Sequence, residues 1–198
     1  MRALIIVDMQ NDFMPTGVLG VAKADELVPL INRLMDHFDY IIATMDWHPK
    51  GHVSFAYSHH KKVGEIIRVG NQEQKLWPDH CVQGTPGAAL VKGLKQSRIE
   101  QIFHKGADPL VDSYSAFFDM SRRRSTGLGD YLRQMGIQEI YFAGVATDYC
   151  VLYSVLDALE MGFKVFVIRD ACRAIDDEEG AIAQMKKKGA EMTLSSDI

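Results

Sequence analysis

The chain has 198 residues, of which 47% are hydrophobic, so we expect one domain, residues 1–198, with a sizeable buried core. Acidic and basic residues are interspersed and sum to a net charge of −4, which argues against a nucleic-acid-binding protein. The apolar run before Asp8 is too short for a signal peptide or a membrane span. The three cysteines lack the spacing of a disulfide framework and favour a reducing compartment, the cytoplasm.

Short apolar runs alternate with segments that repeat apolar residues at helical spacing. The runs predict buried strands at residues 3–7, 40–45, 99–103, 139–145 and 163–168. Helical patterns follow Asp25, begin at Leu128 and begin again at Leu152, and Gly136 ends the second. This alternation predicts an α/β protein with three layers, α/β/α, and a mainly parallel central sheet. We expect residues 50–87, rich in His, Gly, Pro and Lys, to form an elaborated surface segment near a site.

Polar side chains stand at the ends of four predicted strands. Asp8 ends the first, Asp46 and His48 the second, Lys105 the third, and Cys150 follows the fourth. In open α/β sheets, ligands bind beyond the carboxyl ends of the strands. A charged residue directly after an apolar run also needs partners if it is partly buried. The sequence therefore predicts one site in which these side chains meet.

Cys150 comes where the fourth strand runs into a helix. We expect Thr147 to be the N-cap, which puts Cys150 in the first helical turn, where the helix dipole favours a reactive thiolate. Asp8 can then accept the thiol proton, and Lys105 can hold that carboxylate and stabilise the thiolate. A blander interpretation stays open, in which Asp8 and Lys105 form a purely structural ion pair and Cys150 is an inert buried residue.

A second group of candidate residues combines a carboxylate with imidazoles. Asp46 and His48 share one side of an extended segment, and His80 joins them if the intervening loop folds back. Such ligands suit Zn²⁺, Fe²⁺ or Mn²⁺, and three protein ligands leave positions open for water or substrate. The ion can polarise a ring nitrogen or activate a water. His52 is a further candidate, whereas we interpret Cys81 as a buried residue outside the site.

Three aromatic residues lie near these motifs. Phe13, Trp77 and Tyr114 can supply flat apolar walls for a planar substrate, although each taken singly fits ordinary packing.

The motifs together resemble one family along essentially the whole chain. Residues 8–13 (DMQNDF), 105–106 (KG) and 144–151 (GVATDYCV) are similar to the three hallmark blocks of the isochorismatase-like cysteine hydrolases. Within that superfamily, residues 46–55 (DWHPKGHVSF) and 77–85 (WPDHCVQGT) resemble the nicotinamidases, and residues 114–117 (YSAF) are also close to a nicotinamidase segment.

The resemblance implies the isochorismatase-like hydrolase fold and hydrolysis of nicotinamide, and of pyrazinamide, to the acid and ammonia through a cysteine thioester. It implies one divalent metal ion, zinc foremost, with iron or manganese as alternatives. The residues it implies are Asp8, Lys105 and Cys150 as the catalytic triad, Asp46, His48 and His80 as metal ligands with His52 as an additional or outer ligand, and Phe13, Trp77 and Tyr114 around the ring.

The resemblance also implies a cis peptide between Val145 and Ala146, with the backbone N–H groups of Ala146 and Cys150 forming an oxyanion hole. Other functions stay open on the residues alone: a metal-free amidase or isochorismatase-type hydrolase, a binding protein that keeps the pocket, or a redox-sensing thiol protein. The metal, the oligomeric state and the role of residues 57–75, which show no family pattern, are open too.

Overall fold

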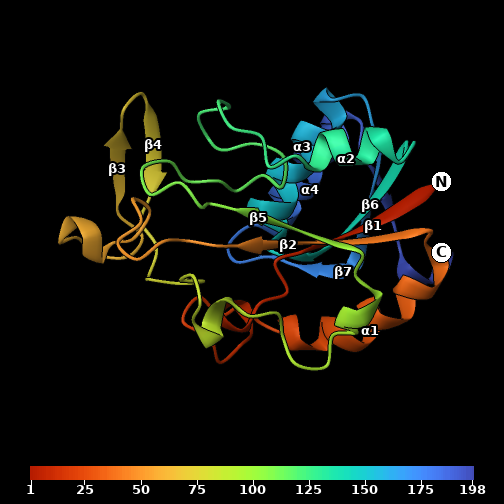
Figure 1. Cartoon of the computed structure of the whole chain (residues 1–198), viewed down its shortest axis with the longest axis horizontal. Coiled ribbons are helices and arrows are strands. Elements are labelled where there is room, and N and C mark those ends of the chain that lie inside the picture. The colour runs from red at the N-terminus through yellow and green to blue at the C-terminus, as the bar shows by residue number, and fades with distance from the viewer.

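The computed structural model describes residues 1–198, and its centre is a six-stranded parallel sheet (Figure 1). The strands lie in the order β5–β2–β1–β6–β7–β8. Their bounds are β1 Arg2–Val7, β2 Tyr40–Asp46, β5 Gln101–Lys105, β6 Glu139–Val145, β7 Lys164–Arg173 and β8 Glu191–Thr193. Every neighbouring pair is parallel, as the nearly continuous apolar strands predict.

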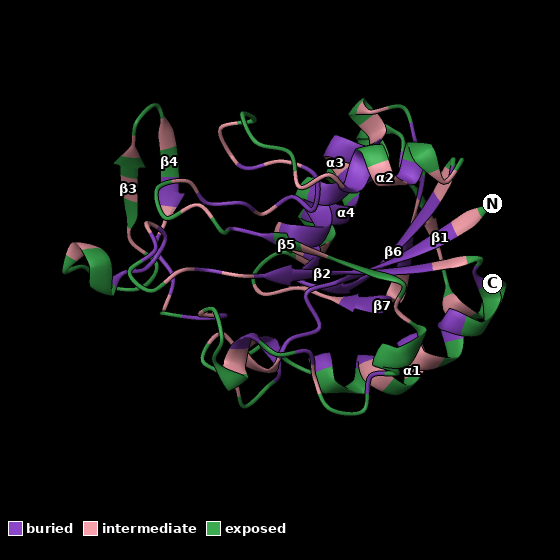
Figure 2. Ribbon diagram, viewed as in Figure 1, coloured by how far each residue is buried: buried purple, intermediate pink, exposed green.

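Helices cover both faces of this sheet. The helix bounds are α1 Leu27–Leu34, α2 Leu128–Gln134, α3 Leu152–Glu160 and α4 Glu178–Lys188. Alternate residues of β1 point to opposite faces, so Leu4 and Ile6 pack in the core beneath α1, while Ile5 and Val7 pack in the core beneath α2, α3 and α4. Figure 2 shows the strands buried between these layers. The predicted three-layer α/β/α architecture is confirmed.

The predicted strand at residues 99–103 is displaced by two residues. The observed strand, β5, runs to Lys105 because its pairing with β2 extends from Ile42–Gln101 to Asp46–Lys105. Being an edge strand, β5 leaves Ile102 37% exposed, so its apolar residues mark its bounds poorly. The last helix and strand, α4 and β8, were absent from the prediction, since α4 is largely polar and β8 is only three residues long.

A small antiparallel hairpin stands apart from the main sheet. It consists of β3, Ile66–Val69, and β4, Gln72–Lys75, within the segment expected to be an elaborated surface feature. Figure 1 shows it beyond the arrowhead of β2, away from both chain termini. The sequence signal for it was Gly70-Asn71 between the two short strands, a dipeptide typical of tight hairpin turns.

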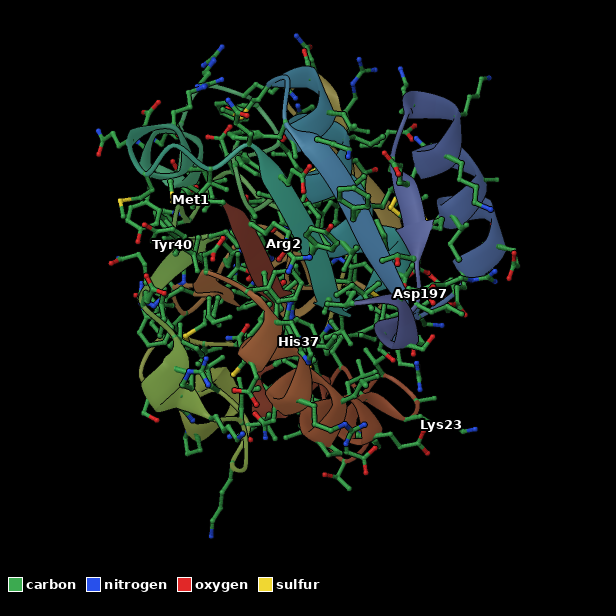
Figure 3. The ribbon with its side chains drawn as sticks, turned by 90° about the vertical axis from the view of Figure 1, so that its right-hand side faces the viewer. Met1, Arg2, Lys23, His37, Tyr40 and Asp197 are labelled. Carbon is green, nitrogen blue, oxygen red and sulfur yellow. The ribbon has the colours of Figure 1, made fainter.

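The strand order places the site at a topological switch point. From β1 the sheet grows through β2 and β5 on one side and through β6, β7 and β8 on the other. Clefts form at such a point because consecutive connections leave β1 and β6 in opposite directions. Asp8 follows β1 and Cys150 follows β6 at this edge. Figure 3 views the molecule from the opposite end, where Arg2 and Tyr40 begin their strands.

Candidate active site

The Lys105 ammonium is the centre of a buried polar cluster. Its Nζ lies 2.5 Å from Asp46 Oδ1 and 2.8 Å from Asp8 Oδ2, and it donates a hydrogen bond of 3.2 Å to Cys150 Sγ. The contact with Asp8 Oδ2 is an ion pair without hydrogen-bond geometry, which leaves that oxygen without a hydrogen-bond partner. A carboxylate oxygen of Asp8 also lies within 4.8 Å of the thiol sulfur. The Cys150 thiol, the candidate base Asp8 and the Lys105 ammonium are thus close enough to interact with one another.

Burial and charge set the protonation of this cluster in opposite ways. Burial alone would favour a neutral amine, but Asp46 and Asp8 hold the pKa of Lys105 well above its usual range. Burial raises the pKa of Asp8, although Lys105 opposes the shift. Burial, with Asp8 and Asp46, raises the pKa of Cys150 well above its usual range. This direction favours the thiol over the expected thiolate, so attack by Cys150 calls for a base that accepts its proton.

The local backbone presents Asp8 to the thiol. Asp8 has a left-handed backbone with φ 50°, an uncommon conformation for a non-glycine residue, directly after β1. Thr44, on β2, donates to Asp8 Oδ1 at 2.6 Å. Gln10 is buried, and its side-chain amide bonds both the N–H and the C=O of Asp46, each at 2.8 Å. These contacts tie the ends of β1 and β2 together.

Cys150 lies in a π-helical turn, Thr147–Val151, directly before α3. The N–H groups of Tyr149 and Val151 both donate to the C=O of Ala146, at 3.1 and 3.0 Å. The expectation that Thr147 is the N-cap is wrong: Ala146 occupies the extended N-cap position, and the Thr147 hydroxyl is buried without a hydrogen-bond partner. The helical segment begins at Thr147 itself, one residue earlier than a cap at Thr147 requires, and the threonine side chain makes no capping hydrogen bond.

The peptide between Val145 and Ala146 is cis, as the family resemblance implies. The backbone N–H of Ala146 makes no hydrogen bond within the chain. Ala146 and Cys150 both line one pocket. A free N–H beside a thiol is the element from which an oxyanion hole is built.

Asp46, His48 and His80 converge on one point. His48 Nε2 lies 3.7 Å and His80 Nε2 3.8 Å from the same oxygen, Asp46 Oδ2. The chain returns to His48 through residues 80–83, where the His48 N–H donates to the C=O of Cys81 and the Gln83 N–H donates to the C=O of His48. The two distances from Nε2 to Asp46 Oδ2 are too long for hydrogen bonds and suit three atoms that share an ion.

Backbone carbonyls fix the orientation of both imidazoles. The Nδ1 of His48 is 2.9 Å from the C=O of Gly106, and the Nδ1 of His80 is 2.7 Å from the C=O of Pro78. A proton on each Nδ1 leaves each Nε2 lone pair free for a metal, the usual support of a histidine ligand. Two imidazole nitrogens and one carboxylate oxygen suit zinc, iron or manganese, so the residues fit a divalent ion.

His52 lies beside this group without joining it. Its ring is tilted by 33° against that of His48 with centroids 4.2 Å apart, and its Nδ1 pairs with Ser54 Oγ at 2.8 Å. It belongs to a second group of possible ligand atoms, with His48 and Asp112. Asp112 was missed in the sequence, although it lines the same pocket as Cys150 and accepts a 2.9 Å hydrogen bond from Gln74 of β4.

The three predicted aromatic residues, Phe13, Trp77 and Tyr114, line the pocket with the metal and thiol residues. Trp77 Nε1 donates to the Tyr114 hydroxyl at 2.9 Å. Sequence reasoning missed three further wall residues, which are Leu19, Tyr149 and Ile175. Cys81 is fully buried and burial raises the pKa of its thiol, in agreement with its interpretation as a residue outside the site.

These features define an α/β protein with a parallel sheet whose switch point carries a buried Asp–Lys–Cys cluster beside an Asp–His–His group. The model of the isochorismatase domain matches residues 2–197. The chain belongs to the isochorismatase family, as its motifs predict. None of its helices is both long and apolar enough to cross a lipid bilayer.

Similar proteins share this fold over nearly their full length. A nicotinamidase of Escherichia coli is 46% identical, over 99% of this chain and 96% of that protein. The structure of an Acinetobacter baumanii nicotinamidase/pyrazinamidase matches with a TM-score of 0.96 and 42% identity, covering 99% of this chain and 97% of the other. A Pyrococcus horikoshii pyrazinamidase in complex with zinc matches with a TM-score of 0.80 and 38% identity, covering 98% of each chain.

Proposed function

We propose that the protein hydrolyses nicotinamide to nicotinate and ammonia, with Cys150 as nucleophile. The observation that carries the proposal is the position of one buried ammonium, Lys105, between the Cys150 thiol, Asp8 and the ligand candidate Asp46. A planar pyridine carboxamide can place its ring nitrogen at the Asp–His–His group and its carbonyl carbon at the thiol of the same pocket. The similarity to nicotinamidases supports this substrate over other amides.

The chemistry follows from the protonation of the cluster. As Cys150 Sγ attacks the carboxamide carbon, its proton passes to the Asp8 carboxylate, whose raised pKa suits it to accept a proton. The N–H groups of Ala146 and Cys150 stabilise the oxyanion. Asp8 returns the proton to the departing amine, ammonia leaves, and a thioester with Cys150 remains.

Water completes the reaction with the same residues. Asp8 takes a proton from a water that attacks the thioester carbon, and the Cys150 thiolate leaves and regains that proton. Lys105 keeps its charge throughout and holds both carboxylates in place. A divalent ion held by Asp46, His48 and His80, with zinc the first choice, would act as a Lewis acid that binds the pyridine nitrogen and fixes the ring. The three free cysteines suit the reducing cytoplasm that we propose as its location.

Ammonia release from nicotinamide by the metal-loaded protein tests the proposal. We expect Cys150→Ala to lower kcat by more than about a thousandfold, because the positioned groups that remain cannot replace a nucleophile. Cys172→Ala is the matched control, since Cys172 is equally buried but hydrogen-bonds Phe142 of the sheet core. Turnover that survives in Cys150→Ala would exclude Cys150 as nucleophile, and a wild-type protein that releases no ammonia would exclude nicotinamide as substrate.

A further inference from the structure

The pocket has a buried end and an outward end. Its buried end holds the thiol of Cys150 and the Asp46, His48 and His80 group, all at most 5% exposed. The outward end is formed by four half-buried wall residues, which are Leu19, Tyr114, Tyr149 and Ile175. These four residues, the pocket mouth, are the part of the wall nearest to solvent.

Lys75, the last residue of β4, contacts the pocket mouth through Tyr149. Its Nζ donates to the Tyr149 hydroxyl at 2.8 Å and to Asp176 Oδ2 at 2.8 Å, and it lies 4.6 Å from the centroid of the Trp77 ring. The Tyr149 hydroxyl donates to the same Asp176 oxygen at 2.7 Å. Lys75 thus joins the β3–β4 hairpin to the loop after β7 across the Tyr149 side of the mouth.

The loop on the far side of this contact is itself anchored. The Asp148 carboxylate accepts backbone N–H bonds from Ile175 at 2.9 Å, from Asp176 at 2.6 Å and from Asp177 at 2.9 Å. Asp176 therefore presents its carboxylate to Lys75 from a fixed backbone, and Ile175 is held at the mouth. The contact between Lys75 and Asp176 therefore joins the two-stranded hairpin, which is separate from the main sheet, to this anchored loop.

The geometry of the proposed substrate determines which atom of its ring faces the pocket mouth. This step rests on the proposed function, in which the ring nitrogen meets the Asp–His–His group and the carboxamide at ring position 3 meets Cys150. With positions 1 and 3 both directed to the buried end, position 2 lies between them and position 5, directly opposite, points outward. A substituent at position 5 therefore meets the mouth residues, Tyr149 and Ile175 among them.

We propose that Lys75 is a specificity-determining positioning residue: through its contacts with Tyr149 and Asp176 it holds the mouth closed around an unsubstituted ring and restricts substituents at ring position 5. Lys75 lies outside the reacting atoms and acts through Tyr149. One additional carbon on a substrate changes kcat/KM by about 10- to 200-fold when the substrate binds in a closed apolar pocket. Loosening the pocket wall should therefore have a measurable effect on a substituted substrate.

The test compares nicotinamide with 5-ethylnicotinamide in the metal-loaded protein. We expect Lys75→Met to raise the ratio of kcat/KM for 5-ethylnicotinamide over nicotinamide at least about fivefold, mainly through a lower KM for the substituted amide. Lys75→Arg keeps the positive charge and the hydrogen-bond donors, so its ratio should stay closer to wild type than that of Lys75→Met. Lys61→Met, which breaks the exposed Lys61–Glu65 pair of the same segment, is the matched control.

The outcomes separate this inference from the proposed function. A wild-type protein that turns over nicotinamide, together with a Lys75→Met ratio within twofold of wild type, overturns the role of Lys75 and leaves the function intact. An equal rise in Lys61→Met also overturns it, since any loosening of the segment would then suffice. A wild-type protein inactive on nicotinamide refutes the proposed function itself. Asp176→Ala should reproduce the Lys75→Met ratio, and failure to do so counts against the ion pair.

Discussion

His52 is a fully buried imidazole with one ring nitrogen, Nε2, that has no hydrogen-bond partner. Burial, with the neighbouring His48, lowers its pKa to about 4 from an ordinary value of 6.5. Between these values the unfolded chain binds a proton at His52 that the folded protein excludes. Stability therefore rises with pH through this window and is lost as the pH falls from 6.5 toward 4.

We expect His52 to lower the free energy of unfolding by about 2–3 kcal/mol as the pH falls from 7 to about 4.5. The measurement is urea unfolding of wild type and His52→Gln in the presence of a chelator, which keeps metal from the neighbouring ligands. Gln does not titrate, so the stability difference between the two proteins should shrink or reverse in favour of the variant on acidification. A difference that stays constant with pH would show that His52 binds its proton as readily in the folded protein as in the unfolded chain, which contradicts a lowered pKa.

At this scale the sequence predicts the residues that stand at strand ends. Asp8 and Cys150 follow the apolar strands β1 and β6, and Asp46 and Lys105 are the last residues of β2 and β5, so topology alone puts all four at one edge. Asp112 escaped prediction because it lies in an irregular loop and its partner, Gln74, belongs to a hairpin that was not foreseen. No periodic pattern links two such residues.

At the scale of secondary-structure elements, β1 and β6 pair closely beside the site. Gly144 in β6 has φ 122°, and a Cβ there would lie 2.1 Å from the backbone O of Val7. Backbone atoms in the middle of a sheet cannot move aside. We expect Gly144→Ala to destabilise the protein by more than about 4 kcal/mol or to prevent folding, as measured by urea unfolding or by the yield of folded protein.

Gly162, between α3 and β7, is the matched control. It also has a positive φ, 87°, but a Cβ there would meet no atom within 4 Å. Gly162→Ala should cost only the left-handed backbone penalty, about 1–2 kcal/mol. If the two variants lose similar stability, the close contact with Val7 is not what requires glycine at position 144.

The elements predicted well are those whose burial is uniform. Residues 139–145 were predicted with their observed bounds because β6 lies in the interior of the sheet, apolar on both faces. The π-helical turn at Thr147–Val151 could not be read from the sequence, since it depends on how the chain leaves β6 and not on the pattern of α3. The hairpin was not predicted for a different reason: β3 and β4 have only four residues each, and β4 is polar throughout, so only the turn residues between them carried a signal.

Across the whole molecule, the candidate metal group joins parts of the chain that are far apart in sequence. Asp46 ends β2, whereas His80 comes from the long segment that carries the hairpin and Trp77. A bound ion would link that segment to the sheet. An ion that binds only the folded state adds about 2.7 kcal/mol of stability at a hundredfold excess over its Kd.

We therefore expect chelation to abolish ammonia release and to lower the Tm by about 5–10 °C, since about 1 kcal/mol corresponds to about 2–4 °C in a chain of this size. Differential scanning calorimetry of the loaded and chelated protein measures the shift, and re-addition of zinc, iron or manganese shows which ion restores both Tm and activity. His48→Ala removes one ligand, so its Tm should not respond to the chelator. A wild-type Tm that stays unchanged after metal analysis shows that the chelator has removed the ion would contradict an ion that links this segment to the sheet.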